Sequence, residues 1–375
     1  MTRVPLPWQA YATLVALLAA VVLPLSRVDP SLHLWQGGTG AVIVLIVAGA
    51  AIVGGALRGD VLSDVVLFIA AHGAALYAVS LLPSLTGAAG SGFWSLVIAA
   101  WLLAWLLVSR LSARSPQAPA ARWFLNLLVP LIFGVWLLLL WQIVVVGAGV
   151  PSVLLPPPSA VWAKLTTDPA QVWADFDQTF LKSVLIGYVC GCGLGFFVAL
   201  IADRFPFARR GLLPIGNFVS ALPLVGVAPI LVMWFGFDWP SKAAVVVVMT
   251  FFPMLVNTVA GLNAADAIER DLMHTYAANY WQSLIKLRLP AALPFIFNAL
   301  KINSTLAMIG AIVAEFFGTP IVGMGFRINI AAGRLEVDLV WAVIAVAALA
   351  GSVFYGVVAL IERTATFWHP SFRQS

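Results

Sequence analysis

Charged side chains are scarce in this chain. Asp, Glu, Lys and Arg make up 9% of its 375 residues, whereas a soluble domain carries about 25%. The chain also contains no Gly-Lys dipeptide, and therefore no G-x-x-x-x-G-K-[ST] phosphate-binding loop. The hydrolase patterns G-x-S-x-G and H-E-x-x-H are absent as well. We therefore expect no enzyme, no ATP hydrolysis by this chain itself, and no catalytic residue, cofactor or metal.

Cysteine occurs only at Cys190 and Cys192, in the phrase IGYVCGCGLG. Such a pair can bind a metal ion or cycle between redox states, but neither a histidine nor a third cysteine lies near it. The glycines around the pair favour close packing of one helix against another. We therefore interpret the two cysteines as packing residues.

Apolar sequence is abundant. Hydrophobic residues account for 62% of the chain, and the mean hydropathy is +1.02. A helix needs about 20 apolar residues to cross a bilayer, and the apolar runs are continuous rather than alternating, which favours helices over a barrel. The sequence predicts an all-α, polytopic helical membrane protein with about ten transmembrane helices. The ten runs are 10–26, 39–57, 61–82, 93–109, 123–147, 179–201, 211–235, 241–262, 294–317 and 338–361.

The distribution of Lys and Arg predicts the orientation of these helices, because cytoplasmic loops are enriched in both. With ten spans and a cytoplasmic N-terminus, 14 of the 20 Lys and Arg residues fall on the cytoplasmic side, among them Arg3, Arg58 and Arg373. Both termini are then cytoplasmic. The net charge of +5 is explained by topology, and because the charges are scattered among loops we expect the lipid bilayer, not nucleic acid, as a partner.

A polar stretch, RLSARSPQAPAAR at Arg110–Arg122, divides the chain. Its Pro, Ser and Arg content is typical of a linker. Six apolar runs come after it and four precede it. The sequence therefore predicts an accessory module of about four transmembrane helices at 1–122 and a six-helix core at 123–375.

The most informative segment is the charged stretch from Asp266 to Lys301, between two apolar runs. Asp266 and Glu269 have the spacing of a capping box that begins a helix. A break is expected around Ala277–Asn279, with a second short helix after it. We expect Pro290 and Pro294 to end that helix and begin the next, because proline is tolerated in a first turn but not in a helix interior.

This segment resembles the cytoplasmic coupling loop, or EAA motif, of ATP-binding-cassette importer permeases. The phrases FFPMLVNTVAGL, KLRLPAALPFIFNALKI and GAIVAEFFG resemble the nitrate, sulfonate and taurine branch of that family, and are closest to its members for thiamine-pyrimidine precursors and riboflavin. The similarity covers about Arg122 to Pro370. It implies a type I ABC importer permease core and a coupling loop at 264–290.

The resemblance also implies a function and partners. The chain would form the translocation path of an ATP-driven importer in the bacterial inner membrane, for a pyrimidine- or riboflavin-like heterocycle or a sulfonate- or nitrate-type anion. The implied partners are an ABC ATPase subunit, an extracytoplasmic substrate-binding protein and a second permease chain, as a homodimer. The alternatives are a degenerate or scaffolding permease-like protein and an ion-coupled secondary transporter.

The resemblance assigns the positions of the family's coupling motif to residues of this sequence. The usual Glu-Ala-Ala is replaced here by Asp271-Leu272-Met273, and the usual glycine by Ala277. Because glycine takes a left-handed turn without a Cβ penalty, alanine makes that turn less favoured, with Asn279 as the next best residue for it. The residues expected to couple to the ATPase are Asp271, Leu272, Met273, Ala277, Trp281, Leu284 and Pro290.

Polar residues inside apolar runs are candidates for the translocation path or its gate: Asn257, Asn298, Asn303 and Glu315. An acid within an apolar span needs a partner or water, and Arg327 or Arg334 could supply the charge for Glu315. We favour a structural or gating ion pair at Glu315 over direct contact with substrate.

Overall fold

The computed structural model describes residues 6–36, 38–56, 61–114, 116–220, 223–318 and 321–368. Arg3, Arg58 and Arg373, three of the cations behind the predicted orientation, lie outside these residues. The described elements are helical, apart from one isolated bridge between Ser26 and Ala89. The predicted all-α class is therefore confirmed. The chain forms two compact units, Met1–Trp162 and Ala163–Ser375, and each is described by itself.

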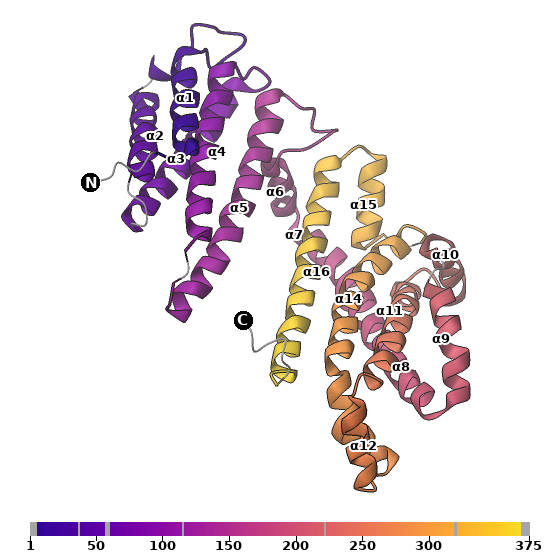
Figure 1. Ribbon diagram of the computed structural model, residues 1–375. Coiled ribbons are helices and arrows are strands. Elements are labelled where there is room, and N and C mark those ends of the chain that lie inside the picture. Colours follow the sequence, from indigo (N-terminus) through magenta and orange to yellow (C-terminus); the bar gives the residue numbers. More distant parts are fainter. Residues whose placement is uncertain are drawn as a thin grey trace. The chain divides into compact units, whose positions relative to one another are not determined.

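The main helices described in the first unit are α1 (Trp8–Val22), α2 (Gly38–Ala56), α3 (Val61–Leu85), α4 (Ser91–Ser112) and α5 (Pro119–Ala148). α4 packs against α1 and α3, and α5 lies beside α3 and α4 (Figure 1). Five buried alanines of α3 explain the close approach of its neighbours, because their spacing of three and four residues places them on one face. These alanines are Ala70, Ala71, Ala74, Ala75 and Ala78.

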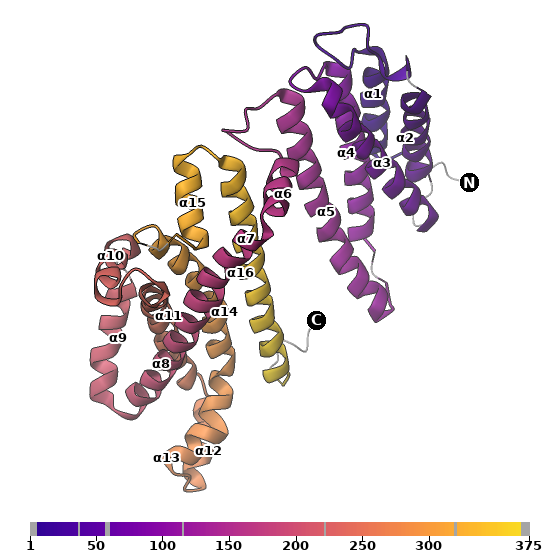
Figure 2. The ribbon, with the colours of Figure 1, turned by 180° about the vertical axis from the view of Figure 1, so that it is seen from behind.

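The second unit is built around α11 (Trp239–Leu262), which packs against α8 (Leu185–Arg204) and α14 (Leu289–Glu315) (Figure 2). The surrounding helices are α7 (Pro169–Phe176), the π-helical turn η2 (Asp177–Val184), α9 (Pro206–Ser220), α10 (Leu224–Phe235), α15 (Met324–Gly333) and α16 (Val337–Ala365). The short helix α6 (Pro158–Thr167) spans the division between the two units.

Glycines of α8 allow its contact with α11. Gly187, Gly191 and Gly195 recur every four residues, and a Cβ on any of them would lie 2.1–2.6 Å from the nearest atom of α11. Helices in membranes use such small residues to bring two backbones together. The interpretation of the Cys190–Cys192 phrase as packing sequence agrees with this contact, since Cys192 is buried in the same core.

Seven described helices are long and apolar enough to cross a membrane: Val61–Leu85, Ser91–Ser112, Pro119–Ala148, Pro169–Arg204, Trp239–Leu262, Tyr280–Glu315 and Val337–Ala365. The other three predicted runs fall on shorter apolar helices. α1 has 15 residues and is about 22 Å long, less than the roughly 30 Å of a bilayer core. The run 211–235 is divided between α9 and α10, with Pro223 directly before α10, where a missing N–H costs nothing.

Candidate functional site

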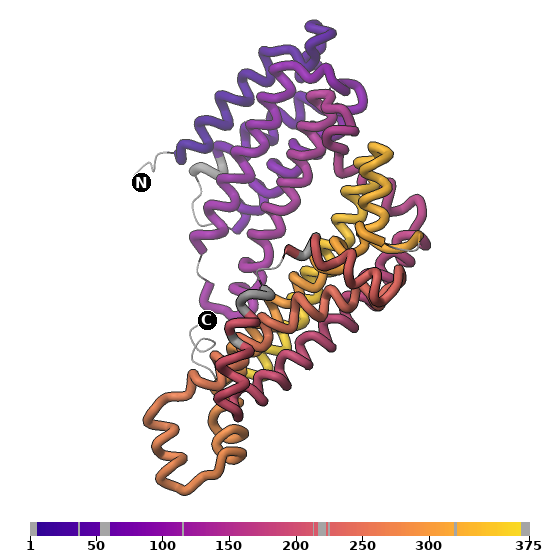
Figure 3. Tube along the Cα trace, turned by 90° about the vertical axis from the view of Figure 1, so that its right-hand side faces the viewer, coloured from indigo at the N-terminus to yellow at the C-terminus, as the bar shows by residue number. Residues whose placement is uncertain are grey.

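The segment between α11 and α14 projects beyond the ends of the neighbouring helices of its unit (Figure 3). Its first helix, α12, spans Ala267–Thr275. The Asp266 carboxylate accepts a hydrogen bond from the backbone N–H of Ile268 at 3.3 Å, and the Glu269 carboxylate accepts one from the N–H of Asp266 at 3.4 Å. The predicted capping box is confirmed. It pairs backbone donors that a helix start otherwise leaves free.

The turn after α12 differs from the prediction. Ala277 itself takes the left-handed conformation, with φ of 53°. The N–H of Ala277 donates to the carbonyl of His274 at 2.9 Å, and that of Ala278 donates to Met273 at 3.0 Å. This pair of bonds is the usual end of a helix at a left-handed residue, and it offsets the cost of an alanine there. Asn279 has another role, since its side chain caps the next helix by accepting from Gln282.

The prediction that Pro290 and Pro294 end one helix and begin the next is wrong, because Pro290 lies in the first turn of α14 without a break before it and Pro294 lies inside α14. α13 (Tyr280–Ser283), the π-helical turn η3 (Leu284–Arg288) and α14 adjoin one another without interruption. In a π-helical turn each N–H bonds five residues back, as Leu289 does to Leu284. This wider turn carries the chain into the first turn of α14, where Pro290 is tolerated.

The π-helical turn also changes which side chains face outward. Leu284 is 2% exposed and packs in the core of the second unit, whereas the adjacent Ile285 is 62% exposed. The expectation that Leu284 lies on the exposed coupling surface is therefore corrected: its side chain anchors the segment to the core. Sequence spacing missed this because it assumed a uniform 3.6-residue period.

The remaining coupling candidates lie on the projecting segment. No residue of α12 is buried, so Leu272 and Asp271 are exposed and Met273 is half-buried. Trp281 on α13 is 63% exposed. The segment therefore exposes several large apolar side chains. The members of this coupling surface are Ile268, Leu272, Tyr276, Trp281 and Ile285.

An ion pair fixes the segment to two other helices. The Arg288 guanidinium donates to both carboxylate oxygens of Asp203 at 2.9 and 2.5 Å, and its Nε donates to the carbonyl of Leu262 at 2.9 Å. The Tyr280 hydroxyl donates to the same carboxylate at 2.8 Å. Asp203 lies at the end of α8, and Leu262 ends α11. One arginine therefore joins the coupling segment to the two helices that flank the core of the unit.

A second polar cluster lies at the opposite end of α14, around Glu315. One carboxylate oxygen accepts from the Thr179 hydroxyl at 2.8 Å, and the other accepts from the N–H of Gly325 at 2.6 Å. The Thr179 hydroxyl also accepts from the N–H of Met324 at 2.7 Å. Glu315 is 2% exposed. The carboxylate thus ties η2 and the start of α15 to the end of α14.

The cation expected to pair with Glu315 pairs elsewhere. Arg327 contacts Asp175, with Nε to Oδ2 at 2.8 Å, and Asp175 also accepts from the N–H of Gly323 at 2.8 Å. Lys242 is a cation within electrostatic range of Glu315, and it is buried and donates to the carbonyl of Phe237 at 2.6 Å. Two carboxylates, Glu315 and Asp175, therefore bind neighbouring backbone amides at the start of α15.

Asp238 closes this cluster at the start of α11. Its carboxylate accepts from the Gln178 amide at 2.9 Å and from the N–H of Trp239 at 2.7 Å. Both hydrogen bonds lower the pKa of Asp238 below its ordinary value, and the bond from Gln178 has the larger effect. The carboxylate therefore stays ionised as a helix cap.

The comparisons with known proteins agree with one another. Residues 191–366 match the family described as binding-protein-dependent transport system inner membrane component. The riboflavin transport system permease protein RibX of Chloroflexus aurantiacus is 31% identical over 271 residues, 71% of this chain and 98% of RibX. The chain belongs to the ABC importer permease family. The permease is therefore a multi-pass transport subunit and not an enzyme.

Two further relatives differ in the substrates that their names give. The putative aliphatic sulfonates transport permease protein SsuC of Bacillus subtilis is 28% identical to the permease, over 69% of this chain and 92% of SsuC. The formylaminopyrimidine transport permease protein ThiX of Halalkalibacterium halodurans is 29% identical, over 64% of this chain and 96% of ThiX.

The four residues expected along the path of the permease do not gather at one place. Asn298 and Glu315 are both on α14, 17 residues and so about 25 Å apart along the axis. Asn257 donates to the carbonyl of Pro253 in its own helix at 2.8 Å. Asn303 is fully buried and donates to the carbonyl of Thr250 at 2.8 Å, which joins α14 to α11. Asn298 is exposed.

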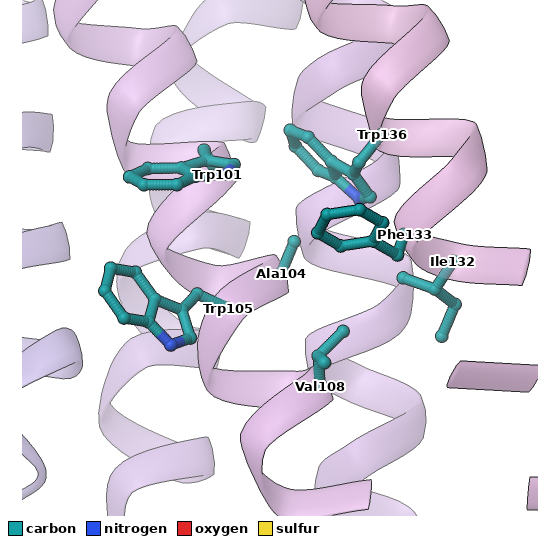
Figure 4. Close-up of a pocket in the computed structure, with 7 residues that line it drawn as sticks. All are labelled: Trp101, Ala104, Trp105, Val108, Ile132, Phe133 and Trp136. Atoms are coloured by element: carbon teal, nitrogen blue, oxygen red, sulfur yellow. The ribbon is translucent and has the colours of Figure 1, made fainter. Parts of the chain in front are cut away.

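Tryptophan gathers in the first unit of the permease, where α4 and α5 enclose a cavity of about 290 Å³. Figure 4 shows Trp101 and Trp105 on α4 and Phe133 and Trp136 on α5 among the side chains that line this cavity. The described residues that line this cavity include no charged side chain. The cavity lies outside the matched residues 191–366, so the family match gives it no role.

Several residues of the two clusters were not found from sequence: Asp203, Tyr280, Asp175, Thr179 and Lys242. Asp203 and Arg288 are 85 residues apart, and a local pattern carries no information about such a pair. For Asp203, the sequence shows only an acid at the end of an apolar run. An acid in that position is more often exposed to water than paired. Arg327 was found, but with the wrong carboxylate.

Proposed function

We propose that the permease forms the translocation path of an ATP-driven importer and is coupled to a separate ATPase subunit through residues 264–290. The observation that carries this proposal is the coupling surface, a set of exposed apolar side chains on a segment held by buried contacts at its base. Exposed apolar side chains on a projecting element are typical of a protein interface. A hydrolysing partner is needed because the permease has no phosphate-binding loop of its own.

Anchoring by Arg288 gives this surface a mechanical role. Displacement of α12 and α13 by a bound ATPase would be passed through the Arg288–Asp203 pair to α8, and through the Leu262 carbonyl to α11. Both helices pack on one another and on the membrane-spanning part of α14. Rigid elements joined by buried contacts transmit movement between distant sites. The coupling movement would therefore reach the core helices directly.

At the other end of α14, the Glu315 cluster is proposed as a gate element. Its hydrogen bonds are made to η2 and to the start of α15, and they satisfy both carboxylate oxygens. A carboxylate bonded in this way holds helices together rather than contacting the substrate. Asn303 is likewise proposed as a bond between helices. Asn257 and Asn298 remain the candidates for contact with a solute.

The remaining partners and the location are proposed from the family. We propose an extracytoplasmic substrate-binding protein and a second copy of the permease as partners, in the inner membrane of a bacterium with both termini in the cytoplasm. The solute is a small organic molecule, either a heterocycle of the riboflavin and formylaminopyrimidine kind or a sulfonate-type anion, as the names of the relatives suggest.

Copurification and uptake test the proposal together. The tagged permease would be expressed with the ATPase and binding protein encoded beside it, isolated, and reconstituted into vesicles. We expect the ATPase to copurify and uptake of the solute held by the binding protein to require ATP. Copurification without uptake would favour a degenerate permease, and uptake driven by an ion gradient without ATP would favour a secondary transporter.

A further inference from the structure

The cavity between α4 and α5 is lined by three tryptophans, Trp101, Trp105 and Trp136, far from the ends of their helices. Trp101 is the eleventh of the 22 residues of α4, about 15 Å along that helix. Trp136 is the eighteenth of the 30 residues of α5. Both helices are long and apolar enough to cross a membrane. Tryptophan in membrane proteins gathers at the two water interfaces, so indole rings at this depth need another explanation.

Neighbouring rings hold the tryptophans of the cavity in place. Trp105 packs edge-on against Trp8 of α1, with ring centroids 5.2 Å apart, and its centroid lies 5.3 Å from that of Trp101. Trp136 packs edge-on against His72 of α3 at 5.9 Å. Aromatic rings favour such edge-to-face contacts. The aromatic walls are therefore formed in advance, as is usual for a small-molecule site.

The indole N–H of Trp136 is a buried donor without a partner. Trp136 is 4% exposed, and none of the residues that the structure describes accepts a hydrogen bond from its nitrogen. The nearby His72 is bonded through Nδ1 to the carbonyl of Phe68 at 2.8 Å instead. In the view of Figure 4, the Trp136 nitrogen lies on the edge of the ring next to Phe133, which also lines the cavity. Because an indole only donates and an unpaired buried donor is costly, the cavity favours a ligand with an acceptor.

The position of the cavity gives the ligand access from the bilayer. The rings of Trp101 and Trp105 are each about two-fifths exposed, so the cavity lies at the surface of the first unit. Its volume of about 290 Å³ is at the small end of ligand sites, which run from roughly 300 to 1,000 Å³. A compact ring system fits such a space, and a substituent of the ring would stay in the lipid.

We propose that this cavity binds a neutral, planar ring with a carbonyl group, of the quinone class, taken from the bilayer. The ring would stack among the indoles, and its carbonyl oxygen would accept a hydrogen bond from Trp136 Nε1. An acyl chain would leave this donor unpaired. A quaternary ammonium group, which aromatic sites also bind, would meet the donor edge of Trp136 with its positive charge. A heterocycle with several N–H groups would leave those groups unpaired, because the described lining includes no acceptor side chain.

Two ligands of nearly the same shape test the hydrogen bond. 2,3-Dimethyl-1,4-naphthoquinone carries two carbonyls and has no free quinone carbon for a thiol to attack, whereas 2,3-dimethylnaphthalene has the same ring skeleton and no acceptor. Each is added in radiolabelled form to the full-length chain in lipid nanodiscs, with empty nanodiscs as the blank. We expect one quinone per chain, bound roughly fivefold more tightly than the hydrocarbon, the ratio that one neutral hydrogen bond gives.

Trp136→Phe keeps an aromatic ring and removes the donor. It should reduce the affinity for the quinone to that for the hydrocarbon, and leave the affinity for the hydrocarbon within about twofold. Trp123→Phe is the matched control, because Trp123 is an exposed residue of α5 that does not line the cavity. It should bind both ligands as the unchanged chain does.

A second pair of variants fills the cavity without removing the donor. Val108→Phe places a ring among the lining residues and should abolish binding of both ligands. Ile98→Phe, at an exposed position of α4 outside the cavity, should not, and circular dichroism confirms that each variant is folded. Equal binding of the quinone and the hydrocarbon, quinone selectivity kept in Trp136→Phe, quinone binding kept in Val108→Phe, or binding of benzyltrimethylammonium or lumichrome as tight as that of the quinone would overturn the proposal.

Discussion

Arg288 and Asp203, which are 85 residues apart in the sequence, form a bidentate ion pair. Both side chains are largely buried. The pair joins the end of the coupling segment to the end of α8. Removing one partner of such a pair is costly because the other charge stays buried without compensation. The pair therefore makes the position of the coupling segment dependent on the core of the unit.

Asp203→Asn should destabilise the permease. We expect a loss of about 3 kcal/mol, because the Arg288 guanidinium would keep its burial and lose its counter-charge. The matched control is Asp271→Asn, which changes an exposed acid on the coupling segment and should change stability by less than about 0.5 kcal/mol. Thermal unfolding in detergent measures both. Equal melting temperatures for the two variants would contradict a structural role for the pair.

Ala277→Gly should stabilise the turn between α12 and α13. A left-handed alanine costs about 1 kcal/mol that glycine does not incur, and the two backbone hydrogen bonds of the turn stay in place. Slower hydrogen exchange of the amides of residues 277 and 278 is the expected result. Ala278→Gly is the control, and it should show no such protection, because its backbone φ is not positive. Faster exchange in Ala277→Gly would show that the turn is held by other means.

Trp281→Asp should separate the permease from its ATPase. The variant places a charge where the proposed interface buries an aromatic side chain, and an unpaired buried charge costs several kcal/mol. We expect loss of copurification and of ATP-dependent uptake, with the permease itself still folded because Trp281 is exposed. Trp281→Phe keeps an apolar ring and should retain both. Normal assembly in Trp281→Asp would remove the coupling assignment.

Thr179→Val should loosen the start of α15. The threonine hydroxyl donates to Glu315 and accepts from Met324, so valine of similar size removes two hydrogen bonds and leaves buried groups unpaired, at a cost of roughly 2–3 kcal/mol. Hydrogen exchange across residues 323–333 should become faster. Thr179→Ser keeps the hydroxyl and should behave as the unchanged permease. If hydrogen exchange across this segment were equally slow in Thr179→Val and Thr179→Ser, the hydroxyl would not be needed, and the position of α15 would depend on Asp175 alone.

The class, the family and the local signals of the coupling segment were predictable from the sequence. The capping box at Asp266 was predictable because its residues are three positions apart. Long-range contacts were not predictable in this way: Asp203 meets Arg288, and Glu315 meets Thr179, through the fold alone. Leu284 was misplaced because a π-helical turn breaks the 3.6-residue period. The left-handed conformation of Ala277 was considered less favoured than it is. Two backbone hydrogen bonds of the turn outweigh the cost of about 1 kcal/mol of placing an alanine in that conformation.

The first 122 residues are predicted to be an accessory module, and removing them tests this. In the structure α5 belongs to the first compact unit, beside α3 and α4, while the family match begins at residue 191. Four helices, α1 to α4, precede α5. An even number of crossings is removed whether α1 and α2 cross the membrane as a pair or not at all, so the remaining helices keep their orientation.

We therefore expect residues 122–375 to insert with the coupling segment in the cytoplasm. Reporters placed after Leu262 and at Pro156 should show opposite sides of the membrane, as in the full-length chain. The exposed face of α5 would then meet lipid in place of α3 and α4, which is acceptable for a face made of apolar side chains. Failed or inverted insertion, or correct insertion with uptake lost, would make the first four helices part of the transport machinery.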